Sequence, residues 1–191
     1  MQVTIKSQTM LKLKPRKTID DYLKLPENVR AELIGGELFM TPSPRFSHQD
    51  VAAKLLLHLT GFVEAQGLGK VAIAPLDVHL PSQDIVQPDV MFIRKSNAAI
   101  IQDWVRGAPD LVIEVLSPDS NERDRIVKRE LYARNGVPEY WIADPATGTV
   151  EVLVSRNGSY ESHGYFEAGD NLDSPALPGL ALPVNAIFQK R

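Results

Sequence analysis

The chain has 191 residues, of which 43% are hydrophobic and 24% are charged, and this composition excludes both a disordered chain and a membrane-embedded one. The absence of cysteine excludes disulfides, thiol nucleophiles and thiolate zinc sites. No apolar run approaches the roughly 20 residues of a membrane span, and the basic N-terminus lacks the apolar block of a signal peptide. We therefore expect a soluble, cytoplasmic α/β protein with no membrane partner.

Two basic clusters stand out against a net charge of −3. Residues 1–17 carry five lysines and arginines and no acid. We interpret them as a basic N-terminal arm, for which a disordered conformation is one option, and residues 18–191 as one domain. The second cluster, 123–129, is interrupted by Asp124. A solvated tail and a solvated helix face explain both clusters at least as well as a DNA surface, because phosphate-binding proteins usually show an overall basic excess.

The predicted elements alternate between strands and helices along the chain. Thr18 caps a short helix, and Gly35-Gly36 joins the strands 30–34 and 37–41 as a hairpin turn. The strongest helix runs over 47–66, with apolar residues at the spacing of one buried face and Gly67 and Gly69 after it. Strands are expected at 71–80, 85–93, 111–116, 139–143, 150–154 and 160–166, a second helix at 120–134, and an irregular, proline-containing tail after them. Because the central strands are continuously apolar, we expect a mixed sheet with helices on both faces.

Two of these apolar strands contain an acid where a buried side chain is expected. Asp89 lies within 85–93 and Glu114 within 111–116. A buried carboxylate is costly unless it is paired or binds a cation. Adjacent strands lie about 4.8 Å apart, so both acids can reach one ion if their strands are neighbours. Asp110 is four residues before Glu114 on the same strand, about 13 Å away, and we interpret it as a strand-entry residue.

The helix that follows presents Asp124, Val127, Lys128 and Leu131 on one stripe. Lys128 therefore borders an apolar face. Alone, this position is explained as well by a packed side chain whose ammonium reaches solvent or pairs with Asp124 four residues earlier.

Together these residues resemble the Uma-type family of restriction endonucleases, a bacterial group within the PD-(D/E)XK nuclease superfold. The matching stretches are 32–38, 87–90, 109–118, Asp124, Lys128, Tyr132 and 136–145, and the resemblance spans about residues 18–185. It implies a restriction-endonuclease-like core in which Asp89 and Glu114 are the two motif acids. Leu116 stands where the motif has its lysine, and Lys128 matches a lysine that has moved to the following helix. Glu32 matches an N-terminal acid of such sites.

The resemblance implies a metal-dependent endonuclease that acts on DNA. Asp89, Glu114 and the Val115 carbonyl are expected to hold Mg²⁺ or Mn²⁺, which prefer oxygen ligands. Lys128 is expected to stabilise developing negative charge, Gln87 to orient the attacking water, and Glu32 to assist the metal or its water shell.

Several alternatives remain open from the sequence, among them an enzyme that acts on RNA or on a small phosphodiester. The acidic net charge and the lack of an appended DNA-reading domain also fit an inactive nuclease-fold module for nucleic-acid binding or assembly. A homodimer is plausible, because one compact domain needs two active sites to cut both strands. Asp77 and His79 alternate onto one strand face, which a half-exposed strand explains better than a metal site does. His48 lies at the start of the predicted long helix, where N-terminal capping or surface exposure is expected more than a place in the cleft.

Overall fold

The computed structural model describes residues 15–26, 28–118 and 122–188. The lysines at 6, 12 and 14, on which most of the predicted basic arm rests, lie outside the described residues. Lys17, at the end of that segment, donates its backbone N–H to Gly36 O at 2.8 Å. Among the helices of the described residues, none combines the length and the hydropathy that crossing a membrane requires.

A six-stranded mixed sheet forms the centre of the protein, in the order β11-β10-β9-β8-β6-β3. Its strands are β3 (Gly69–Ile73), β6 (Val90–Arg94), β8 (Leu111–Val115), β9 (Glu139–Asp144), β10 (Thr149–Arg156) and β11 (Ser159–Phe166). β8 and β9 run parallel, whereas the other neighbours are antiparallel. This sheet confirms the predicted α/β class with a mixed central sheet.

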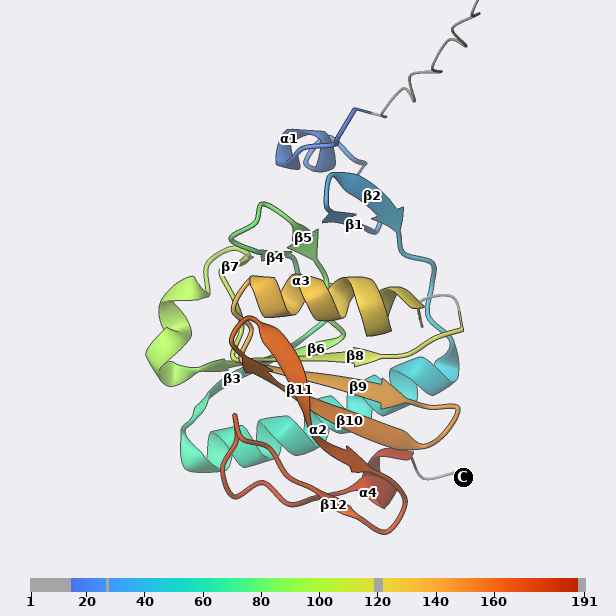
Figure 1. Ribbon diagram of the computed structural model, residues 1–191, viewed down its shortest axis with the longest axis vertical. Coiled ribbons are helices and arrows are strands. Elements are labelled where there is room, and N and C mark those ends of the chain that lie inside the picture. The colour runs from blue at the N-terminus through green and yellow to red at the C-terminus, as the bar shows by residue number, and fades with distance from the viewer. Residues whose placement is uncertain (1–14, 27, 119–121, 189–191) are drawn as a thin grey trace, which may run out of the picture.

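Helices cover both faces of the sheet, as its continuously apolar strands require. α2 (Phe46–Gln66) lies along one face, and η2 (Arg123–Lys128) with α3 (Arg129–Arg134) lies along the other (Figure 1). Val90 and Phe92 pack on the α2 side, and Met91 and Ile93 on the α3 side. Successive side chains of β6 therefore enter two separate hydrophobic clusters, because strand residues alternate between faces.

The N-terminal hairpin belongs to a second, smaller sheet of order β2-β1-β5-β4-β7. Its strands are β1 (Ala31–Ile34), β2 (Glu37–Met40), β4 (Val78–His79), β5 (Ile85–Val86) and β7 (Val105–Arg106). Gly35 and Gly36 form the predicted turn with φ of 60° and 81°, a conformation that favours glycine. The capped helix α1 (Ile19–Tyr22), with Thr18 and Asp21 in a capping box, precedes this sheet.

Two predicted strands are each divided between the two sheets. The run 71–80 forms β3 and β4, and the run 85–93 forms β5 and β6. Pro75 and Pro88 lie at the two breaks, and proline has no N–H to donate to a strand ladder. The prediction of one strand in each run was therefore wrong, and the break in the second run places Asp89 where the chain enters the central sheet.

The C-terminal tail packs against the α2 face of the sheet. It contains β12 (Asn171–Leu172), β13 (Leu182–Pro183) and α4 (Val184–Phe188). The remaining helix, η1 (Lys95–Ile100), is not part of the tail and directly follows β6. Glu139, buried on β9, accepts hydrogen bonds from Trp141 Nε1, Ser174 Oγ and Ala176 N at 2.6, 2.6 and 2.7 Å. This carboxylate ties the tail to the sheet.

Candidate active site

The two motif acids lie side by side at one end of the central sheet. β6 and β8 are antiparallel neighbours, and their register pairs Val90 with Ile113. One step further along both strands, that register brings Asp89 beside Glu114. The condition on which the sequence argument depended, that the strands of the two acids are neighbours, is therefore met.

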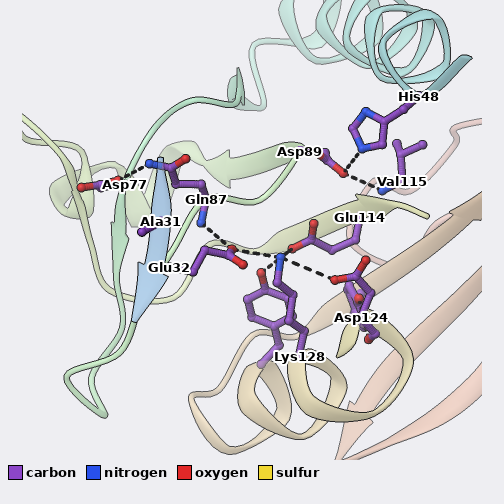
Figure 2. A network of polar contacts seen from close by, with 12 residues as sticks. Ala31, Glu32, His48, Asp77, Gln87, Asp89, Glu114, Val115, Asp124 and Lys128 are labelled. Atoms are coloured by element: carbon purple, nitrogen blue, oxygen red, sulfur yellow. Dashed lines mark hydrogen bonds and ion pairs between the residues drawn. The ribbon is translucent and has the colours of Figure 1, made fainter. Parts of the chain in front are cut away.

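Asp89 is held by the backbone of β8 and by a histidine of α2. Its Oδ2 accepts the Val115 N–H at 2.8 Å and lies 3.0 Å from His48 Nε2 (Figure 2). Burial lowers the pKa of His48, but the hydrogen bond and charge of Asp89 outweigh it and raise that pKa above its ordinary value. His48 is the third residue of α2, at the helix start as expected, but its side chain lies in the site on Asp89 and neither caps the helix nor faces solvent. A neighbouring acid was not identifiable for it before α2 and β6 were packed together.

Glu114 lies on the face of the sheet that α3 covers, and two residues of that helical segment reach it. Its Oε1 accepts from Tyr132 Oη at 2.6 Å and from Lys128 Nζ at 2.9 Å. The Lys128 ammonium is also 2.9 Å from Glu32 Oε1 and 3.6 Å from Asp124 Oδ1 (Figure 2). The structure thus brings Glu32, Glu114 and Lys128 together. Tyr132 was part of the family resemblance, but no contact with Glu114 was predicted for it.

The Lys128 cluster is almost completely buried, with Glu32, Glu114, Asp124 and Lys128 only 2–3% exposed. Burial raises the pKa of Glu114 well above its ordinary value, and although Lys128 opposes this, the other carboxylates add to it. Burial lowers the pKa of Lys128, but Glu114, Glu32 and Asp124 outweigh it and keep that pKa well above its ordinary value. The ammonium therefore stays charged between three acids.

Gln87 contributes through its backbone more than through its side chain. Its N–H donates to Glu32 Oε1 at 3.0 Å, which fixes the carboxylate beside Lys128. The Gln87 side-chain amide instead donates to Asp77 Oδ1 at 2.8 Å, on the side away from Glu114 (Figure 2). The Gln87 side-chain oxygen Oε1 is buried without a hydrogen-bond partner in the described chain, so the predicted orientation of a water by this amide does not require its nitrogen to leave Asp77.

A cavity of about 250 Å³ opens onto this cluster. Residues of the predicted site, His48 and three arginines line it: Arg30, Glu32, Arg45, His48, Gln87, Asp89, Glu114, Val115, Arg123, Asp124 and Lys128, with Met40–Pro44, Gln49, Ala74 and Ser117. A ligand in the cavity would therefore meet the acids, Lys128 and the arginines at once.

Asp89 and Glu114 fit a hard divalent cation through one free oxygen of each carboxylate. Within the described residues, no three Asp, Glu or His side chains converge as a metal-binding group. Mg²⁺ commonly uses only one or two carboxylates and completes its shell with water and phosphate oxygens. The hydrogen bonds of Asp89 and Glu114 in the described chain all use Oδ2 and Oε1, which leaves one oxygen of each carboxylate for such an ion.

The other acids considered from the sequence lie outside this cluster. Asp110 accepts the Arg94 N–H at 2.8 Å and the Asn97 side-chain amide at 3.0 Å, as a strand-entry residue would. Asp77 accepts from Tyr22 Oη at 3.0 Å, whereas His79 stacks on Trp104 with ring centroids 5.5 Å apart. Asp77 and His79 therefore make separate contacts within the smaller sheet.

Comparison with known proteins places the chain among nuclease-like proteins. The family model described as "Uma2: Putative restriction endonuclease" matches residues 19–185. A crystal structure from Anabaena variabilis ATCC 29413, described as "a putative nuclease belonging to DUF820", is similar with a TM-score of 0.76 and 23% identity. The match covers 90% of this chain and 97% of that one, and at this identity it shows the shared fold alone. No curated protein matches the chain.

Proposed function

This chain belongs to the Uma2 family, "Putative restriction endonuclease", and from that premise we propose that it is a metal-dependent endonuclease that hydrolyses phosphodiester bonds in DNA. The observation that carries the proposal is the cluster at one end of the sheet. Asp89 directly precedes β6, and Glu114 is the next-to-last residue of the neighbouring strand β8. The Lys128 ammonium lies 2.9 Å from Glu114. Fold alone would not be sufficient support, because one superfold serves many activities.

Asp89, Glu114 and the Val115 carbonyl are the groups that would hold Mg²⁺ or Mn²⁺. When bound, such an ion polarises the phosphodiester and lowers the pKa of a bound water. The Val115 N–H and His48 both bond to Oδ2 of Asp89, so they fix the orientation of that carboxylate. His48 is in this view a positioning residue for the first acid.

Lys128 is the cation that this chain itself supplies to the reaction. Its charged ammonium is fixed by Glu32 and Glu114 and would stabilise negative charge that develops on the phosphate oxygens. Glu32 is fixed in turn by the Gln87 N–H. Because these groups are ordered before substrate binds, little reorganisation is needed at the moment of reaction.

The test combines Mn²⁺ titration by calorimetry with nicking of supercoiled plasmid. The variants are Asp89→Asn and Glu114→Gln, and the matched control is Asp110→Asn, which removes a charge from the entry of the same strand that carries Glu114. We expect wild type and the control to bind Mn²⁺ and nick DNA, and both site variants to lose the two activities. Circular dichroism checks that every variant is folded.

Other outcomes would change the proposal in defined ways. Metal binding without nicking would support the ion site but contradict DNA cleavage. DNA binding that needs no metal and tolerates Glu114→Gln would favour a non-catalytic nuclease-fold module. The contacts of Lys128 with three acids are a specific reason to test this alternative, because they engage its ammonium within the protein. Sedimentation of the wild type with and without duplex DNA tests the predicted homodimer.

A further inference from the structure

Three arginines from distant parts of the chain line the same cavity as the acids. Arg30 directly precedes β1, Arg45 directly precedes α2, and Arg123 is the first residue of η2. The fold thus collects them from three separate elements at the opening that leads to Glu114. Their number is notable in a protein whose net charge is −3.

These three arginines are not neutralised by the acids around them. In residues 15–26, 28–118 and 122–188, none of the three forms an ion pair or a side-chain hydrogen bond with another residue. Arginines elsewhere in the same part of the chain do pair with acids: Arg94 with Asp110, Arg125 with Asp144, Arg134 with Asp84 and Arg156 with Glu161. Guanidinium donors that face a cavity without an acid partner are available to an anionic ligand.

Two of the three guanidinium groups are partly buried. The Nε atoms of Arg30 and Arg123 are buried without a hydrogen-bond partner in the described chain. The Arg123 guanidinium also lies 5.6 Å from the centroid of the Phe39 ring, at a distance typical of cation–π contact. Arg45 is exposed, and its side chain does not cap α2. The arginines therefore differ in exposure but share the cavity.

Neither the acids nor a metal ion accounts for these arginines. The buried acids already have Lys128, which lies within 3.6 Å of Glu32, Glu114 and Asp124. A guanidinium repels a divalent cation and cannot coordinate one, because it has no acceptor. A single phosphodiester at Asp89 and Glu114 would also not need three further cations. Additional phosphates of one continuous strand would.

We propose that Arg30, Arg45 and Arg123 bind the phosphates that flank the scissile one on the substrate strand. This inference rests on the proposed function and assigns the residues that hold its substrate. Arginine binds phosphate oxygens with two parallel N–H donors, and contacts of this kind add affinity without reading the base sequence.

The test measures binding without cleavage, so that it does not depend on activity. Fluorescence anisotropy in EDTA follows a labelled single strand and its duplex over a series of salt concentrations. Each phosphate contact contributes about 0.7 to the slope of log K against log salt for a single strand and about 0.9 for a duplex. Arg30→Gln, Arg45→Gln and Arg123→Gln should each reduce the slope by about that amount, and the triple variant by about 2 to 3.

The matched control is Arg156→Gln, which removes an exposed arginine paired with Glu161 outside the cavity and should leave the slope unchanged. Mn²⁺ affinity of the arginine variants should be equal to or tighter than that of wild type, because a positive charge near the cation is removed. Slopes unchanged on both single strand and duplex would overturn the inference, as would weaker Mn²⁺ binding together with lost DNA binding. Failure of Asp89→Asn to alter Mn²⁺ binding would contradict the proposed function separately.

Discussion

Replacing Lys128 with methionine tests whether the buried cluster is held together by its one ammonium. The substitution keeps an unbranched side chain of similar length in a site that is 3% exposed. It removes the cation that lies 2.9 Å from both Glu32 and Glu114 and 3.6 Å from Asp124. Three acids then remain close together and buried without their cation.

The expected loss in the free energy of unfolding is about 3–5 kcal/mol at pH 8, the usual cost of removing one partner of a buried ion pair. For a domain of this size that corresponds to a lower Tm by roughly 6–20 °C. The pKa of Glu114, already raised by burial, rises further without Lys128. A carboxyl with a raised pKa in the folded state binds more protons than the unfolded chain, so its stability contribution is present below its ordinary pKa and is lost as pH rises through the raised one. The variant should therefore lose much less at pH 5 than at pH 8.

Urea unfolding followed by fluorescence of the buried Trp141 measures the effect at both pH values. Lys54→Met is the matched control: it breaks a solvent-accessible pair with Asp50 at 2.6 Å and should cost at most about 1 kcal/mol. Adding Glu114→Gln to Lys128→Met should recover part of the stability, since one negative charge is removed. A loss below about 1 kcal/mol, or an equal loss at pH 5 and pH 8, would refute the reasoning.

Three further predictions concern His48 in the site, the buried Glu139 and the glycines that follow α2. His48→Gln should lose more stability at pH 6 than at pH 9 in urea unfolding, because the Asp89 contact raises the pKa of His48. The contribution of His48 to the free energy of unfolding is complete below about pH 6.5 and disappears as pH rises through the raised pKa. Glu139→Ala should cost about 3–5 kcal/mol in chemical unfolding, since three buried donors lose their acceptor, whereas Mn²⁺ affinity should not change. Gly67→Ala should cost about 1 kcal/mol for its φ of 62°, and Gly69→Ala about 2–3 kcal/mol, because a Cβ there would lie 2.1 Å from Ile93 O; thermal unfolding compares the two.

Much of the fold follows from local sequence patterns. The long helix, the Gly35-Gly36 hairpin and the central strands were predictable because periodicity and turn chemistry act over neighbouring residues. The division of two runs between two sheets was not foreseen, although Pro75 and Pro88 mark both breaks. A proline shows where a ladder is interrupted, but not which sheet the chain enters afterwards.

The residues that need an explanation are visible from the sequence alone. Asp89 and Glu114 are carboxylates in apolar strands, and burying them without partners would be too costly. Their pairing was a conditional prediction, which the antiparallel register of β6 and β8 fulfilled.

The partners of these acids, in contrast, depend on how the helices and strands pack against one another. His48 meets Asp89 because α2 packs beneath β6, and Glu32 meets Lys128 because the hairpin joins a separate sheet beside η2. The three arginines likewise share a cavity only after β1, α2 and η2 are assembled. These contacts join segments that are far apart in the chain, and a pattern in neighbouring residues carries no information about the distance between such segments. That distance is fixed when the hydrophobic clusters on both faces of the sheet pack.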